Sequence, residues 1–118
     1  VSQPDAVQAL FDMVLQRFGR LDLLFNNAGV FAPAVSMEDI SFAQWKSVVD
    51  VNLTGLFNTC QASLRGMRQR QDGVIINIAS WAGHFAAYFA GPAYASTKRA
   101  VLALTVIAPS SHKISMRR

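Results

Sequence analysis

The sequence predicts an α/β fold in which helices pack on a sheet of parallel strands. Three stretches with apolar residues three and four positions apart alternate with two short aliphatic runs. Helices that alternate with short buried strands are typical of parallel sheets with right-handed helical crossovers. The chain has 118 residues, of which 52% are hydrophobic and 15% are charged, so it has room for at most one globular domain.

The first predicted helix begins near Ser2 and ends near Gly19. Ser2 is expected to cap its N-terminus, with Pro4 and Asp5 in the first turn. Gly19 is the flexible residue expected at its C-terminus. Its apolar residues form one stripe, which consists of Val7, Leu10, Phe11, Val14, Leu15 and Phe18.

Residues 21–25 are a short apolar run, which predicts a buried parallel strand. The turn-forming residues Asn26, Asn27, Ala28 and Gly29 follow it directly. Open α/β sheets bind ligands at the carboxyl ends of their strands, and small residues there allow close approach. A simple turn is the structural alternative.

A long helical pattern begins at Ser41 and continues to Met67. It contains Asn52, Thr54 and Gly55, which are all poor helix formers. Such an inconsistency marks a kink or a functional site. A buried bend, with the Asn52 amide bonded to the backbone, is the alternative of equal weight.

The second predicted strand covers residues 74–78, and residues 79–91 form a loop of mainly small residues. A third helix begins at Pro92 and ends before Pro109. Only two strands are predicted, so both edges of the sheet would lack a partner. We therefore expect that this segment does not form a stable domain alone.

Tyr94 and Lys98 lie four residues apart, so their side chains share one face of the third helix. A neighbouring ammonium favours the phenolate form of a tyrosine, which equips the pair for proton transfer. Ser80 follows the second strand, where its hydroxyl could bond a substrate carbonyl. The structural alternatives are a packed tyrosine, a solvated lysine and a turn serine.

Several other classes of function find little support. The net charge of +4 depends on Lys113, Arg117 and Arg118, so nucleic-acid binding is not expected. The sequence shows no signal peptide or membrane-spanning run, and a cytoplasmic location is expected. Cys60 is expected to be a buried thiol, while His84 and His112 have no metal-ligand spacing, so no metal site is predicted.

Four motifs together resemble the classical subfamily of the short-chain dehydrogenase/reductase family. They are residues 26–29 (Asn-Asn-Ala-Gly), Asn52 within 51–55, Ser80 at the end of 75–80, and Tyr-Ala-Ser-Thr-Lys at 94–98. The resemblance implies part of a doubly wound, three-layer α/β/α Rossmann-type sheet, with residues 1–105 as the central portion of one NAD(P)-binding domain. Residues 106–118 form a tail without resemblance to the family.

The resemblance also implies an oxidoreductase that transfers a hydride between NAD or NADP and an alcohol or ketone. Tyr94 would be the acid/base, and Lys98 would assist it and bind the nicotinamide ribose. Ser80 would orient the substrate oxygen, and Asn52 would hold a water in a proton relay. Tyr94, Lys98, Val1, Asn27, Ala28 and Gly29 would contact the cofactor.

The glycine-rich turn of the family, and the residue that separates NAD from NADP, would precede Val1. The interval from Ser80 to Tyr94 is one residue longer than is commonest in the family. A full-length parent would be a homo-oligomer, either a dimer or a tetramer. Two alternatives remain: a catalytically inactive fragment that associates through its helices, and epimerase or dehydratase chemistry on the same fold.

Overall fold

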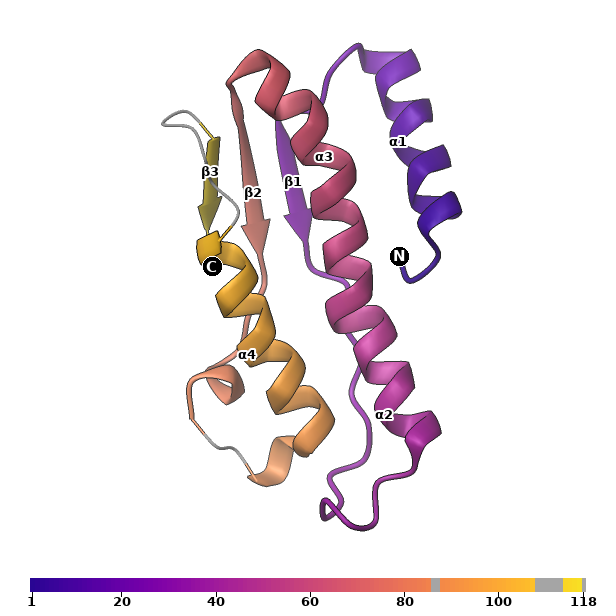
Figure 1. Ribbon diagram of the computed structural model, residues 1–118, viewed down its shortest axis with the longest axis vertical. Coiled ribbons are helices and arrows are strands. Elements are labelled where there is room, and N and C mark those ends of the chain that lie inside the picture. Colours follow the sequence, from indigo (N-terminus) through magenta and orange to yellow (C-terminus); the bar gives the residue numbers. More distant parts are fainter. Residues whose placement is uncertain (86–87, 108–113, 118) are drawn as a thin grey trace.

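The strands form a parallel sheet, and helices cover one of its faces (Figure 1). The computed structural model describes residues 1–85, 88–107 and 114–117. Its elements in order are α1 (Pro4–Phe18), β1 (Leu23–Asn26), α2 (Phe42–Val49), the π-helix η1 (Asp50–Gly55), α3 (Leu56–Arg70), β2 (Gly73–Asn77), the 3-10 turns η2 (Trp81–Gly83) and η3 (Tyr88–Ala90), α4 (Pro92–Ile107) and β3 (Ile114–Arg117). The predicted helices and both predicted strands are therefore present.

The strand order is β1-β2-β3, and both pairs are parallel. The expectation of two strands was wrong, because Ile114–Arg117 pairs with β2 on the side opposite β1. Helix α4 continues to Ile107, so the expected division at 105 falls inside a helix. Pro109 and His112, which the sequence analysis considered, lie outside the described residues.

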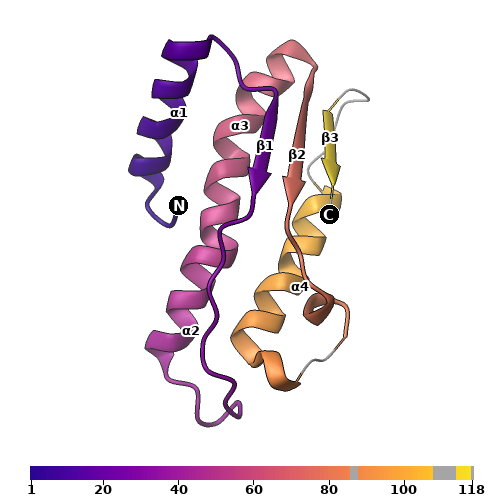
Figure 2. The ribbon, with the colours of Figure 1, turned by 180° about the vertical axis from the view of Figure 1, so that it is seen from behind.

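The open face of the sheet is visible when the molecule is turned around (Figure 2). In this view the strands lie in front of α3 and α4, so these helices pack on the opposite face. Leu23 and Phe25 are 51% and 55% exposed. The prediction that the first strand is buried was therefore wrong, and the chain supplies one of the two helical layers of a three-layer fold.

Local interactions define the helix ends, although Ser2 is not the cap that the sequence predicted. Gln3 occupies the N-cap position of α1 and makes no side-chain cap. Gly19 ends α1 as expected, with a left-handed φ of 75° and an N–H that donates to the Leu15 carbonyl. Ser41 caps α2 in a reciprocal capping box with Gln44.

The apolar stripe of α1 is wider than the contact that α1 makes with α3. Only Val7 and Phe11 of the stripe are buried. Leu10, Leu15 and Phe18 are exposed. The periodicity therefore identified the helix correctly but overestimated the surface that it buries.

The main core lies between α3, α4 and the covered face of the sheet. Its buried members are Leu56, Cys60, Met67, Ile75 and Val101. Cys60 is a buried thiol, as expected, and burial raises its pKa to about 11. Among the helices that the structure describes, none has the length and apolar character needed to cross a membrane.

Gly73 begins β2 where the backbone passes the buried side chain of Met67. Its φ is 155°, and a Cβ built there would lie 2.5 Å from Cγ of Met67. We predict that Gly73→Ala lowers the free energy of unfolding by about 1–3 kcal/mol, measured by urea denaturation of the protein that carries this chain. Gly19→Ala is the matched control, because its Cβ would meet nothing within 4 Å. The control keeps only the backbone strain of about 1 kcal/mol, and an equal loss in both variants would contradict the proposed clash.

The raised pKa of Cys60 predicts slow and strongly pH-dependent alkylation. With a pKa of about 11, about one thiol in a thousand is ionised at pH 8. The rate of iodoacetamide modification should therefore rise about tenfold for each pH unit between 7 and 10. The same chain in guanidinium is the control and should react far faster. Equal rates in the native and denatured states would show that the thiol is accessible.

Candidate active site

The carboxyl ends of β1 and β2 are joined by their last side chains. Asn26 and Asn77 are register partners, and Nδ2 of Asn26 donates to Oδ1 of Asn77 at 2.9 Å. Asn77 is fully buried. Asn77 was not among the predicted site residues, although an amide within an otherwise aliphatic strand was a usable signal.

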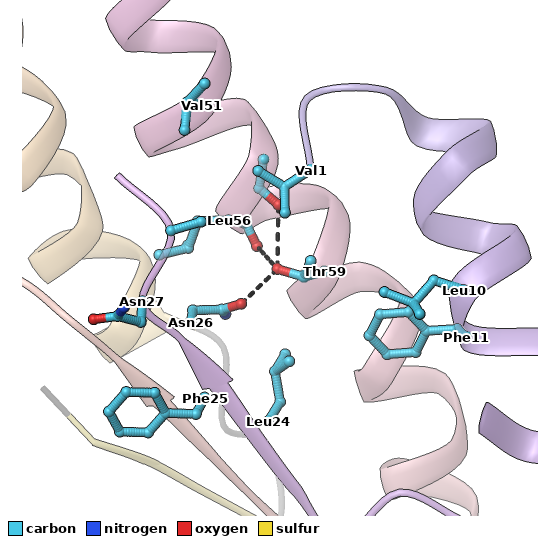
Figure 3. Close-up of a pocket in the computed structure, with 12 residues that line it drawn as sticks. Val1, Leu10, Phe11, Leu24, Phe25, Asn26, Asn27, Val51, Leu56 and Thr59 are labelled. Carbon is cyan, nitrogen blue, oxygen red and sulfur yellow. Dashed lines mark hydrogen bonds between the residues drawn. The ribbon is translucent and has the colours of Figure 1, made fainter. Parts of the chain in front are cut away.

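This amide pair connects the sheet to both covering helices. The Thr59 hydroxyl of α3 lies 2.7 Å from Oδ1 of Asn26, as Figure 3 shows, and Nδ2 of Asn77 donates to the Thr105 hydroxyl of α4 at 3.1 Å. These partners satisfy polar groups that would be costly if they were buried alone. A polar network between α3 and α4 therefore holds the carboxyl ends of β1 and β2 in place.

Asn52 lies in the π-helix η1, where the sequence predicted a kink or a site. Its Oδ1 accepts the Val30 N–H at 2.8 Å, and its Nδ2 donates to the Val30 carbonyl at 2.9 Å. Nδ2 also lies 3.4 Å from the Thr97 hydroxyl of α4. Asn52 thus joins the loop after β1 to η1 and α4. An Asn52 amide bonded to the backbone in a buried bend was the structural alternative to a functional site.

Lys98 is 5% exposed, and its ammonium lies at the same edge of the sheet. Its Nζ donates to the Ile78 carbonyl at 2.7 Å, and the Ile78 N–H donates to the Asn26 carbonyl at 3.0 Å. Burial lowers the pKa of Lys98 from its ordinary value. A Cβ on Gly29 would lie 3.8 Å from Nζ, so the glycine leaves space beside the ammonium.

The ring of Tyr94 lies between apolar residues and the Lys98 ammonium. Nζ of Lys98 is 5.6 Å from the ring centroid, as the helical spacing predicted. Phe31 stacks on the ring with centroids 4.1 Å apart, and Tyr94 also packs against Ala82 and Ala90. The sequence analysis missed Phe31, whose signal was an aromatic residue in the loop after the Asn-Asn-Ala-Gly turn.

Ser80 caps the N-terminus of η2, the short turn that follows β2. Its Oγ accepts the N–H of Ala82 at 3.2 Å, which is the behaviour of a turn-capping serine. Ala82 in turn packs near Tyr94. The structure therefore places Ser80 in the loop beside Tyr94, while its described hydrogen bond is local.

A pocket lies between β1, α1 and α3, and its lining includes Val1, Asn27 and Ala28 (Figure 3). Nδ2 of Asn58 donates to the Val1 carbonyl at 3.1 Å. A Cβ on Gly55 would lie 2.5 Å from Cγ2 of Val1, so only glycine allows this packing. Three of the residues expected at the cofactor therefore share one pocket, and Gly29 lies nearer to Lys98.

Three polar side chains of the site are of kinds that can transfer protons or bind a ligand. Tyr94 offers a phenol, Lys98 a buried ammonium and Ser80 a hydroxyl. Within residues 1–85, 88–107 and 114–117, no group of three or more His, Cys, Asp and Glu side chains could hold a metal ion. A phenol beside a buried ammonium can serve as a proton donor or acceptor.

We predict that Asn52→Ala lowers the free energy of unfolding by about 2–3 kcal/mol, because both backbone groups of Val30 lose their partner. Thermal and urea unfolding of the protein that carries this chain would measure the loss. Asn58→Ala is the matched control, since Asn58 donates a single bond to the Val1 carbonyl, and it should cost about 1 kcal/mol. A larger effect at Asn58 than at Asn52 would show that the Val30 contact is not the main restraint.

Comparisons with known proteins find relatives along most of the chain. The chain is 42% identical over 106 residues to an uncharacterized oxidoreductase of Staphylococcus saprophyticus, covering 89% of this chain and 42% of that protein. It is 36% identical over 105 residues to a 3beta-hydroxysteroid dehydrogenase of Mediterraneibacter gnavus, covering 89% of the chain and 37% of the relative. The chain thus spans about two fifths of the length of these relatives.

A solved structure of ElxO with NADP bound matches with a TM-score of 0.84 and 28% sequence identity, covering 88% of this chain and 42% of that one. The fold is therefore an incomplete portion of a Rossmann-type sheet, as predicted. The family model described as short chain dehydrogenase matches residues 1–112, which extends past the segment in which the sequence analysis saw the resemblance. This chain belongs to the short chain dehydrogenase family.

Proposed function

We propose that the protein carrying this chain transfers a hydride between NAD(P)(H) and an alcohol or carbonyl substrate, with Tyr94 as acid/base. The observation that carries the proposal is the buried Lys98 ammonium, 5.6 Å from the Tyr94 ring centroid and bonded to the end of β2. A charge held away from water acts on its neighbours more strongly than a solvated one. A tyrosine beside such a charge is the arrangement that we propose for proton transfer.

The residues present fit a nicotinamide dinucleotide along the carboxyl edge of the sheet. Gly29 leaves space beside the Lys98 ammonium, where a ribose hydroxyl could accept a hydrogen bond. The pocket lined by Val1, Asn27 and Ala28 lies at the end of β1 and would receive the adenosine end. The cofactor that we propose is NAD or NADP, because neither the space beside Gly29 and Lys98 nor the pocket at Val1 distinguishes the two.

The bound nicotinamide would supply or accept the hydride. In reduction, the Tyr94 hydroxyl would give its proton to the substrate oxygen, and in oxidation the phenolate would take it back. Ser80 would donate a hydrogen bond to the same oxygen once its hydroxyl turns toward the substrate. Asn52 would position the loop that carries Gly29, and its place in a water relay to Lys98 is part of this proposal.

The substrate class that we propose is a secondary alcohol and its ketone. The relative described as a 3beta-hydroxysteroid dehydrogenase supports this class. We also propose a cytoplasmic homo-oligomer, a dimer or a tetramer. Its support is the outward face of α4, where the small residues Ala100 and Ala103 lie near the exposed Val106.

A second candidate function is association without catalysis by this chain on its own. The exposed apolar face of the sheet, with Leu23 and Phe25, favours it, because such a face is normally covered. Titration of the isolated chain with NADH and NADPH would separate the two. Saturable binding would support a competent cofactor site, whereas no binding together with self-association would support the second candidate.

We predict that Tyr94→Phe lowers kcat by at least about 100-fold in the full-length protein, because the ring remains while the proton donor is lost. Steady-state reduction of a ketone with NADPH or NADH would measure it. Cofactor binding and the circular dichroism spectrum should not change. Tyr88→Phe is the matched control, since Tyr88 is the other tyrosine of the chain. Full activity of Tyr94→Phe would refute the assignment.

A further inference from the structure

Exposed aromatic side chains occur on the two loops that contribute residues to the candidate active site. Phe31, Trp81 and Phe89 are 72%, 59% and 73% exposed, and Phe85 is 58% exposed. Large exposed apolar side chains scattered singly need no explanation, whereas a contiguous group marks a binding surface. We refer to these four residues as the aromatic rim.

Phe31 connects the rim directly to the proposed acid/base. One face of its ring stacks on Tyr94 with centroids 4.1 Å apart and an interplanar angle of 17°. The high exposure of Phe31 shows that much of its ring is open to solvent. Phe31 therefore offers an open aromatic surface beside the proposed acid/base.

The other three members form a row on the loop between Ser80 and Tyr94. Trp81 follows Ser80 directly, and its ring stacks with that of Phe89 at 6.2 Å and 13°. The Trp81 ring also contacts the ring of Phe85, with centroids 5.0 Å apart. Trp81 lies in η2 and Phe89 in η3, whose residues Ala82 and Ala90 pack against Tyr94, and Phe85 lies after η2.

We propose that the aromatic rim selects ketones and alcohols with a flat, ring-containing apolar body over linear ones. This inference rests on the proposed function, since it concerns the substrate of the same site. Flat rings stack face to face with an offset on aromatic side chains, and each such pair contributes beyond the area that it buries. A flexible alkyl chain gains only burial there and loses rotational freedom when it becomes ordered.

The test compares two substrates that have the same number of carbon atoms, β-tetralone and a linear decanone, with saturating cofactor and the full-length protein. We expect a higher kcat/KM for β-tetralone. Trp81→Ala should lower kcat/KM for β-tetralone about tenfold and change the value for decanone by less than about twofold. Phe89→Ala is the second variant and should act in the same direction.

Phe18→Ala is the matched control, because Phe18 is also an exposed phenylalanine, at the end of α1 and outside the rim. It should leave both substrates unaffected. An equal loss for both substrates in Trp81→Ala and Phe89→Ala would mean that the rim is structural, and no loss for either would mean that it does not contact substrate. Both results would overturn the inference.

A binding measurement separates failure of this inference from failure of the proposed function. The chain contains two tryptophans, so Trp45→Phe leaves Trp81 as the fluorescent reporter within this chain. Saturable quenching by β-tetralone that weakens when Phe89→Ala is added to Trp45→Phe would support the rim even in a protein without turnover. Turnover of both ketones without quenching, or with quenching that Phe89→Ala leaves unchanged, would overturn the rim and leave the oxidoreductase assignment intact.

Discussion

The hydrogen bond between the Asn26 and Asn77 side chains fixes the edge of the sheet on which the candidate site is built. It joins the last register pair of β1 and β2 and is itself held by Thr59 and Thr105. Buried amides need partners in fixed directions, so a slip of one strand would leave several of them unsatisfied. The Ile78 carbonyl, which binds Lys98, lies one residue beyond this pair. The position of the ammonium therefore depends on the register of the sheet.

The π-helix η1 restrains the site from the helical side. Its wider turn at Asp50–Gly55 interrupts the regular α-helix that begins after Ser41, and Asn52 is buried within this turn. There, Asn52 bonds both backbone groups of Val30. The loop after β1 is thereby tied to the long helix. Gly29 is held beside Lys98 by this restraint, since it precedes Val30 directly.

Local patterns predicted the parts of this molecule that local physics determines. The helices, the Ser41 N-terminus, the Gly19 C-terminus and the irregular turn at Asn52 follow from periodicity, capping and propensity. The pairing of Tyr94 with Lys98 follows from helical spacing alone. The family motifs also placed Val1, Asn27 and Ala28 at one ligand site, and these residues do line a common pocket. Their contacts with a cofactor stay a prediction.

The features that the sequence did not predict depend on distant partners. Four residues at 114–117 become a strand only because β2 offers an open edge, and no period can be recognised in so short a run. The exposure of β1 depends on which layers cover the sheet, which its own residues do not encode. Asn77 was overlooked because its partner lies 51 residues away in the chain. Phe31 was overlooked because stacking on Tyr94 requires a loop path that only tertiary contacts define.

The burial of Lys98 has two opposite effects that explain why the site needs so rigid a frame. Removal from water disfavours the charged form, and a bond to the neutral Ile78 carbonyl offsets only part of that cost, so the pKa is lowered. The same contact holds the ammonium 5.6 Å from the centroid of the Tyr94 ring. An ammonium on a mobile, solvated side chain would avoid the cost but would not be held beside the ring. The amide network and the Asn52 contacts therefore stabilise an arrangement that is unfavourable for Lys98 alone, and in doing so they keep the ammonium beside the Tyr94 ring.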